Sequence, residues 1–214
     1  VRRGVSRRRT VAPSSGVPSA AGAAAAGDAA GRHPLPTPLH FGEAMSRLGI
    51  GDRTRVVVYD DVGGVVAARL WWMLDVLGRE VAVLDGGLKH WIAEGRETED
   101  LPPNPRERHF TGRKDASLVR DVTQVSAAAK LGDHEIIDAR SADRFAGTGT
   151  EPREGLRTGR IPGSRNVPFG TLLNKNGTMK SPEECRAIFE SAGVDLSKPA
   201  ITSCGSGVTA AILS

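Results

Sequence analysis

The stretch "AITSCGSGVTAA", residues 200–211, repeats the pattern of an earlier stretch, "VVVYDDVGGVVAA", residues 56–68. Each begins with an apolar run typical of a buried strand, passes through a glycine-bearing turn and continues into helix-forming residues. The repeat predicts two homologous strand–turn–helix units, in which Asp60 holds the place that Cys204 holds in the second copy. Only the second copy has a thiol there.

Further helices and strands surround both copies. In the first half, we expect a helix that ends at Gly49, a strand over 56–59, a helix that ends at Gly78, a strand over 80–84 and a helix over 88–95. This alternation predicts a parallel sheet covered by helices, and so an α/β fold.

The second half follows the same order. The stretch "SPEECRAIFESAG", residues 181–193, predicts a helix with Ser181 as N-cap, Pro182 in the first helical position and Glu184 in a capping box. A strand over 200–203 and a new helix follow it.

The composition divides the chain into four predicted parts. They are a leader over 1–31, a first domain over 32–100 without a catalytic cysteine, a linker rich in proline and charge over 101–118, and a catalytic domain over 119–214. The leader has no acidic residue before Asp28, and its Arg, Ser, Ala and Gly content fits either a transit peptide or a disordered or non-native segment. We expect a cytoplasmic protein, or a mitochondrial one if the leader directs import.

The bulk composition excludes several classes of protein. The 214 residues are 39% apolar, enough for a packed core, but no run approaches the roughly 18 apolar residues of a membrane span. Five arginines lie in the first ten residues, and removing them from 29 Lys and Arg leaves 24 against 25 Asp and Glu. We therefore expect no nucleic-acid partner. The two cysteines have no zinc-site spacing, so we expect no metal, no disulfide framework and a reducing compartment.

Cys204 is the candidate nucleophile. A strand end, a glycine turn and a helix start would surround its sulfur with backbone N–H groups and favour the thiolate. The alternative is a small buried residue at a strand end, but the glycines favour a close approach of backbone to a ligand. A phosphatase is disfavoured because Ala210, six residues on, stands where an arginine would grip the phosphoryl group. We assign no role to Cys185, which has two glutamates nearby, or to Asp60.

The loop "CGSGVTA", residues 204–210, resembles the active-site loop of the mercaptopyruvate-using members of the tandem rhodanese family of sulfurtransferases. Thiosulfate-using members carry a basic loop of the "CRKGVTA" type. The stretches "RLWWMLDVLG", "LDGGLKHW", "IIDARSADRFAG", "GRIPGSRNVPF" and "KSPEE" support the resemblance, which runs from about His33 to the last residue. It implies two tandem rhodanese-like domains, each a parallel sheet flanked by helices, and no cofactor.

The resemblance also implies a reaction. Cys204 would take sulfur from 3-mercaptopyruvate as a persulfide, release pyruvate and pass the sulfur to a thiol such as thioredoxin, or to cyanide. Ser206 would act beside it, and Arg144 and Arg153 would hold the substrate carboxylate and carbonyl. The residues implied to line the substrate site are Gly205, Gly207, Val208 and Thr209.

Several arginines and His33 have two interpretations. From the residues alone, Arg144 and Arg153 can also be interpreted as surface groups that are solvated or form salt bridges. Arg140 is best interpreted as a residue that holds a loop in place. His33 lies in a proline-rich connector typical of an exposed loop. The resemblance matches it to a histidine of a proton relay with the loop serine and an upstream aspartate, whose place is held by Gly22.

The chain also departs from the family pattern. By resemblance, the first domain lacks its N-terminal part, the second is truncated after the active-site loop, and Arg160 stands where histidine is usual. We expect a sheet without a strand that would cover Val167 and Ile201. Two alternatives to the mercaptopyruvate reaction stay open: a thiosulfate sulfurtransferase and a non-catalytic rhodanese-like binding module.

Overall fold

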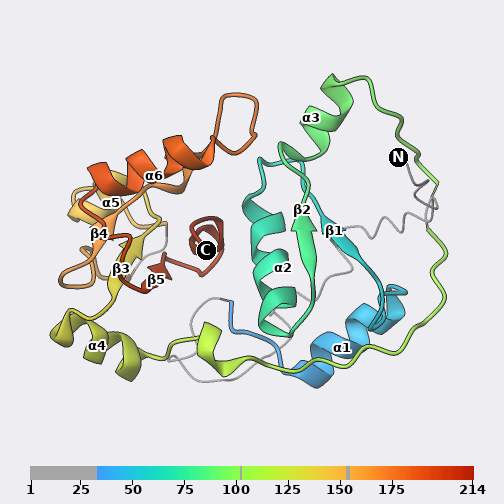
Figure 1. Cartoon of the computed structure of the whole chain (residues 1–214), viewed down its shortest axis with the longest axis horizontal. Helices are drawn as coiled ribbons and strands as arrows, with labels where there is room; N and C mark the ends of the chain where they lie inside the picture. The colour runs from blue at the N-terminus through green and yellow to red at the C-terminus, as the bar shows by residue number, and fades with distance from the viewer. Residues whose placement is uncertain (1–32, 102, 153–154) are drawn as a thin grey trace.

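The computed structural model of the chain describes residues 33–101, 103–152 and 155–214. Its first half contains α1 (Pro38–Arg47), β1 (Val56–Val58), α2 (Val65–Val76), β2 (Val81–Val83) and α3 (Gly87–Ala93). Its second half contains η4 (Ala116–Leu118), α4 (Val122–Leu131), β3 (Glu135–Asp138), α5 (Ala142–Ala146), β4 (Arg165–Asn166), η5 (Phe169–Leu172), α6 (Pro182–Ser191), β5 (Ala200–Ser203) and η6 (Thr209–Ile212). This order confirms the predicted α/β class (Figure 1).

Two parallel sheets form the centres of the two halves. In the first, β1 pairs with β2, and Val56 lies opposite Val81. In the second, β3 lies between β4 and β5, and all four of its residues are buried. Asp138 at the end of β3 lies opposite Ser203 at the end of β5. The carboxyl ends of parallel strands meet at one edge, so the residues after Asp138 and Ser203 share that edge.

Capping contacts fix the ends of two helices in the second half. The Ser181 hydroxyl accepts the N–H of Glu184, and the Glu184 carboxylate accepts the N–H of Ser181, which confirms the predicted capping box of α6. Asp121 and Gln124 form the same motif at α4. Each box satisfies two N–H groups that a helix leaves without a partner at its first turn.

The core of the first half includes a residue of the predicted linker. Phe41, Leu74 and Leu77 are almost completely buried, and Phe110 packs with them. The rings of Phe41 and Phe110 meet edge to face with their centroids 6.0 Å apart. The linker is therefore anchored to the first half, and its path beside α1 is visible in Figure 1. The sequence did not indicate this contact of Phe110, because the surrounding stretch is rich in proline and charged residues, as linkers are.

The core of the second half is more complete than the sequence predicts. Val167 is only 1% exposed, so the expectation that it would lack cover is wrong, whereas Ile201 is half-buried. The residues that pack around Val167 belong to one cluster: Ile137, Leu172, Val194, Ile188, Phe189 and Leu213. Leu213 directly follows η6, so the last turn of the chain supplies part of the cover.

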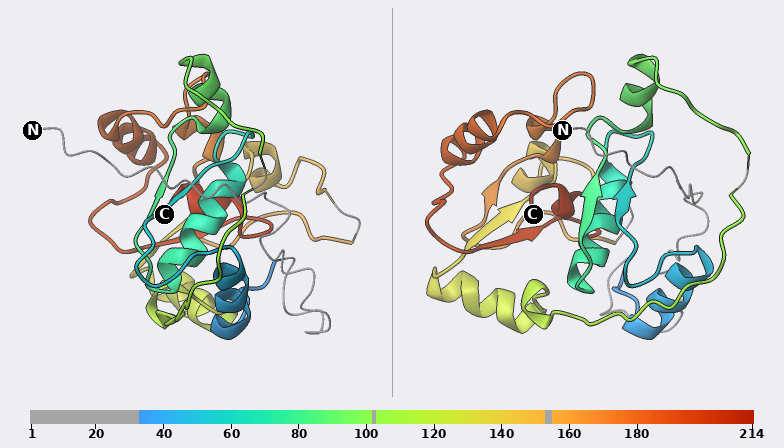
Figure 2. Two further views of the ribbon diagram at one scale, coloured as in Figure 1. Left: turned by 90° about the vertical axis from the view of Figure 1, so that its right-hand side faces the viewer. Right: turned by 45° about the vertical axis from the view of Figure 1, so that its right-hand side comes forward.

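The two halves meet through α2 and η6. Figure 2 shows η6 between α2 and the second sheet. A second link joins the Met179 N–H to the Asp85 carboxylate at 2.7 Å. A helix of the first half therefore lies directly against the segment that follows Cys204.

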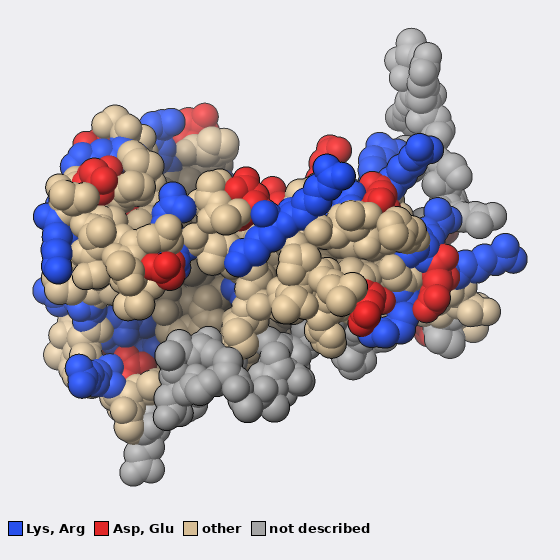
Figure 3. Space-filling view, turned by 90° about the horizontal axis from the view of Figure 1, so that it is seen from below, with Lys and Arg blue, Asp and Glu red and all other residues tan. Residues whose placement is uncertain are grey.

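The face drawn in Figure 3 carries Lys and Arg side chains with Asp and Glu side chains interspersed among them. Within the described ranges, no helix combines the length and the apolar character that crossing a bilayer requires.

Candidate active site

Cys204 directly follows β5 and is half-buried. Its sulfur accepts the N–H of Gly207 at 3.0 Å and the N–H of Ser206 at 3.5 Å. The turn that brings both groups to one atom requires a φ of +74° at Gly207, a conformation that glycine adopts without strain. The local sequence thus builds a small cradle of N–H groups around the sulfur.

The cradle favours the ionised thiol. Burial raises the pKa of Cys204, but the Thr209 hydroxyl and the N–H groups of Ser206, Ala210 and Gly207 outweigh burial and bring the pKa below that of an ordinary thiol. Since the thiolate is the nucleophilic form, the site holds an activated sulfur.

Cys185 has the opposite environment. Burial and the neighbouring Glu184 carboxylate raise the pKa of its thiol. Its sulfur lies 3.6 Å from the Lys180 carbonyl oxygen, which stabilises a protonated thiol only. The two cysteines therefore differ in the way the sequence predicts.

The helix expected after Cys204 differs from the prediction. Thr209–Ile212 forms a single 3-10 turn. Such a short turn has no appreciable macrodipole, so individual N–H groups and the Thr209 hydroxyl stabilise the thiolate instead.

Asp60 shows what the same cradle does in the first half. Its Oδ1 accepts the N–H groups of Val62 at 3.0 Å and Gly64 at 2.7 Å, and its Oδ2 accepts those of Val66 at 2.8 Å and Ala67 at 2.9 Å. In the repeat, Val62, Val66 and Ala67 correspond to Ser206, Thr209 and Ala210, and the pair Gly63–Gly64 stands at the single Gly207. The first copy is therefore an anion cradle that its own carboxylate fills.

Arg144 lies against the Cys204 loop. A Cβ atom added to Gly205 would come 2.8 Å from Arg144 Nη2, so a side chain at this position would move the guanidinium. Arg144 Nη2 and Nε donate to Glu151 Oε2 at 2.6 and 3.1 Å. The Glu151 side chain is only 7% exposed, and its other oxygen accepts from Arg140 Nη1 at 3.1 Å. Glu151 thus orients Arg144, a role that the sequence analysis missed.

Arg140 holds a loop in place, as the residues suggest. Its Nη2 donates to Asp138 Oδ2 and to the Gly159 carbonyl oxygen, each at 2.7 Å. Arg153, the second arginine predicted to bind substrate, lies outside the described residues.

Most of the other predicted residues come together in the Cys204 loop. Ser206, Gly207 and Thr209 contribute to the environment of the sulfur, and Val208 precedes η6 as its N-cap. The backbone carbonyl of His33 accepts from Arg69 Nη2 at 2.9 Å. The relay proposed for His33 stays a prediction.

Arg69 is the second residue that the sequence analysis missed. Its Nη1 donates to the Gly207 carbonyl oxygen at 3.1 Å, although it belongs to α2 in the first half. In the sequence it follows the helical pattern of α2, and nothing near it signals a contact 138 positions away.

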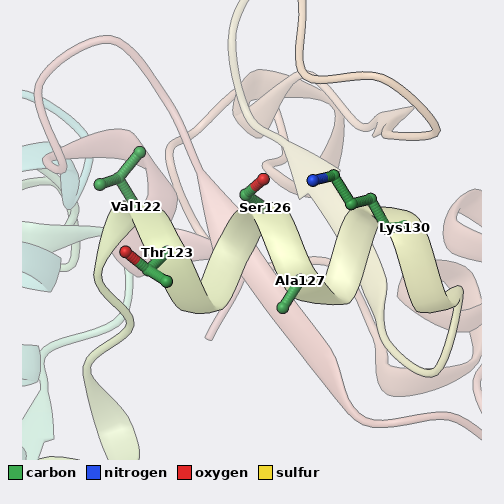
Figure 4. Close-up of a pocket in the computed structure, with 5 residues that line it drawn as sticks. All are labelled: Val122, Thr123, Ser126, Ala127 and Lys130. Carbon is green, nitrogen blue, oxygen red and sulfur yellow. The ribbon is translucent and has the colours of Figure 1, made fainter.

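A hollow elsewhere on the surface follows α4. It is lined by Val122, Thr123, Ser126, Ala127 and Lys130, none of them a predicted site residue. Figure 4 shows Val122, Ser126 and Lys130 on one side of the helix and Thr123 and Ala127 on the other. Within the described parts of the chain, no group of three or more His, Cys, Asp or Glu side chains could hold a metal ion.

The chain is similar to known proteins over most of its length. The profile of the rhodanese-like domain matches residues 28–94 and 121–213. The chain is 40% identical over 181 residues to 3-mercaptopyruvate sulfurtransferase from Homo sapiens and 43% identical over 180 residues to thiosulfate sulfurtransferase from Rattus norvegicus. These matches cover 83% and 82% of the chain, which spans 61% of the length of each relative.

A solved structure shares the fold. The crystal structure of SseA from Escherichia coli, described as a 3-mercaptopyruvate sulfotransferase with the rhodanese fold, matches with a TM-score of 0.75 and 39% identity. The match covers 84% of this chain and 67% of that one.

The two cysteines are expected to ionise at different pH. Because the pKa of Cys204 is lowered and that of Cys185 is raised, the rate of alkylation of Cys204 by iodoacetamide should reach its midpoint at a lower pH than that of Cys185. Mass spectrometry of peptides from a series of pH values measures both rates in one sample. Equal midpoints would contradict the activation of Cys204.

Asp60→Ala is expected to destabilise the first half. It removes the acceptor of four N–H groups, and we expect a loss of about 2 kcal/mol or more in the free energy of unfolding. Urea denaturation measures the loss. Asp61→Ala is the matched control, because Asp61 is an exposed neighbour, and it should unfold like the unmodified chain. A similar loss in the free energy of unfolding of both variants would refute the stabilising role of the contacts between Asp60 and the four N–H groups.

Proposed function

The chain belongs to the rhodanese-like domain family, and we propose that it transfers a sulfane sulfur from 3-mercaptopyruvate, through a persulfide on Cys204, to a thiol acceptor. The observation that carries the proposal is the half-buried Cys204 sulfur in a cradle of N–H groups that lowers its pKa. The human and rat relatives are named for sulfur transfer from two different donors, so their names agree on the class of reaction but not on the donor.

The first step needs no external oxidant. The Cys204 thiolate attacks the sulfur of mercaptopyruvate, an S–S bond forms, and the C–S bond breaks with its electron pair on the departing carbon. The resulting enolate takes up the proton that the donor thiol loses, and pyruvate leaves. Arg144 would hold the carboxylate or carbonyl in a direction fixed by Glu151, and Arg153 would complete a clamp.

The first copy supports a persulfide as the intermediate. Asp60 offers two acceptor atoms to four N–H groups, whereas Cys204 offers one. A persulfide has two sulfur atoms in a row. Its inner sulfur would keep the contacts with Ser206 and Gly207, and its outer sulfur would take the place that Oδ2 of Asp60 has in the first copy. There it would accept from the backbone of Thr209 and Ala210.

The second step returns the thiolate. An acceptor thiolate attacks the outer sulfur, the S–S bond breaks, and its electron pair returns to Cys204. Cyanide would react in the same way and leave as thiocyanate. We propose a protein dithiol such as thioredoxin as the acceptor. We also propose a reducing compartment such as the cytoplasm, because a nucleophilic thiol must stay reduced to accept sulfur.

Mercaptopyruvate is preferred to thiosulfate because the loop beside the sulfur is uncharged. Gly205 and Ser206 carry no charge, and the nearby Arg144 is already paired with Glu151. A dianion such as thiosulfate requires more positive charge at this point than a monoanionic 2-oxo acid does. The 43% identity to rat thiosulfate sulfurtransferase keeps thiosulfate as the second candidate donor.

Persulfide formation tests the reaction directly. After incubation with mercaptopyruvate, the mass of the chain should increase by one sulfur atom, located on Cys204. Cys204→Ser should abolish both the mass increase and sulfur transfer to cyanide, and Cys185→Ser should retain both because its environment disfavours a thiolate. No mass increase with either mercaptopyruvate or thiosulfate would favour a non-catalytic binding module.

Charge at position 206 tests the choice of donor. Substitution of Gly205 would displace Arg144, so we choose Ser206→Lys and use Ser206→Ala as its control for loss of the hydroxyl. A charge about 4 Å from another at an effective dielectric constant of about 20 contributes about 4 kcal/mol before desolvation. We expect the ratio of kcat/KM for thiosulfate to that for mercaptopyruvate to rise at least about tenfold over the control, or about 1.4 kcal/mol. An unchanged ratio would leave the preference for mercaptopyruvate without a physical basis.

A further inference from the structure

Arg69 connects three separate parts of the chain. It projects from α2, where its Nη2 donates to the His33 carbonyl oxygen at 2.9 Å and its Nη1 donates to the Gly207 carbonyl oxygen at 3.1 Å. The carbon at the centre of its guanidinium lies 4.5 Å from the centre of the Trp72 ring. Two carbonyls and one ring therefore hold the group in a single orientation.

No carboxylate in the described part of the chain neutralises the charge of Arg69. Among the described residues, none of the ion pairs includes Arg69, and both of its hydrogen-bond acceptors are neutral. Burial lowers the pKa of Arg69, and the negative charge of Cys204 opposes that effect. Arginine nevertheless keeps its proton in proteins. The Cys204 thiolate is thus an anionic group close enough to interact with this half-buried cation.

Gly207 is held at both of its polar groups. Its N–H donates to the Cys204 sulfur at 3.0 Å, and its carbonyl oxygen accepts from Arg69. A Cβ atom at this position would come 3.2 Å from Arg69 Nη1, so the absence of a side chain keeps the contact close. One glycine therefore links the arginine of the first half to the sulfur of the second.

We propose that Arg69 is a positioning residue for the Cys204 loop: it fixes Gly207 in the conformation that directs its N–H at the sulfur, and it supplies from the first half the positive charge that the loop itself lacks. The proposal extends the sulfur-transfer function proposed above. Only the first copy of the repeat can make this contribution, because the second copy has Ile212 at the position of Arg69. The half without the thiol therefore completes the site of the half that has it.

The test measures the ionisation of Cys204 itself. The pH midpoint of alkylation by iodoacetamide is determined for Cys204 in the full chain, for the unmodified protein and for Arg69→Met and Arg69→Gln. Both substitutions remove the positive charge, and Arg69→Gln keeps a polar N–H donor on a shorter side chain. We expect the midpoint to rise by about one pH unit in both, so that alkylation below the midpoint is about tenfold slower.

Arg47→Met is the matched control. Arg47 is an exposed arginine on α1, and its replacement should leave the midpoint unchanged. If Arg69→Met does not fold, as judged by circular dichroism, the alkylation midpoint of Arg69→Gln decides between the two outcomes. A midpoint within about 0.3 unit of the unmodified value in the folded variants would overturn the proposal.

The result is independent of the reaction. Alkylation requires neither a sulfur donor nor an acceptor, so a raised midpoint supports the role of Arg69 even if the chain forms no persulfide. If the Arg69 variants form the persulfide normally and their midpoint is unchanged, the proposed role of Arg69 is refuted and the proposed function stands.

Discussion

The structure depends on the convergence of backbone N–H groups on one acceptor at the end of a parallel strand. N–H groups that a tight turn directs inward must find an acceptor, because an unpaired buried donor costs about 1–3 kcal/mol. In the first copy, the two oxygens of Asp60 satisfy four of them. In the second, a single sulfur is the acceptor, and it can meet this demand best as an anion. The same backbone thus stabilises a carboxylate in one half and activates a thiol in the other.

The sheet then brings the remaining groups to the sulfur. β3 and β5 are parallel neighbours in register, so Asp138 and Ser203 end at the same edge. Arg140 is tied to Asp138, and the nearly buried Glu151 joins Arg140 to Arg144 beside the loop. A buried carboxylate shared by two arginines restricts both, and Arg144 consequently faces the loop with little freedom to move.

Local patterns were sufficient to predict the fold, because each depends on neighbours in the sequence. The repeat, the parallel order, the capping box at Ser181 and the strand over residues 200–203 all follow from spacing and residue type. The glycines around Cys204 similarly indicated a cradle.

The sequence did not indicate the contacts between distant segments. Phe110 lies in a stretch that resembles a free linker, and Arg69 lies in an ordinary helical pattern, yet each contacts a remote partner. Only the packing of α2 against η6 brings Arg69 to Gly207.

The carboxylate of the first copy also has a consequence for the second. Oδ2 of Asp60 holds the N–H groups of Val66 and Ala67, and thereby fixes the first turn of α2. Arg69 follows two residues later on the same helix. A thiol in place of Asp60 would offer one weaker acceptor and leave this turn less firmly held. The exchange of cysteine for aspartate therefore removes reactivity from the first half but gives it a rigid helix. That helix in turn holds the guanidinium that contacts the loop of the reactive half.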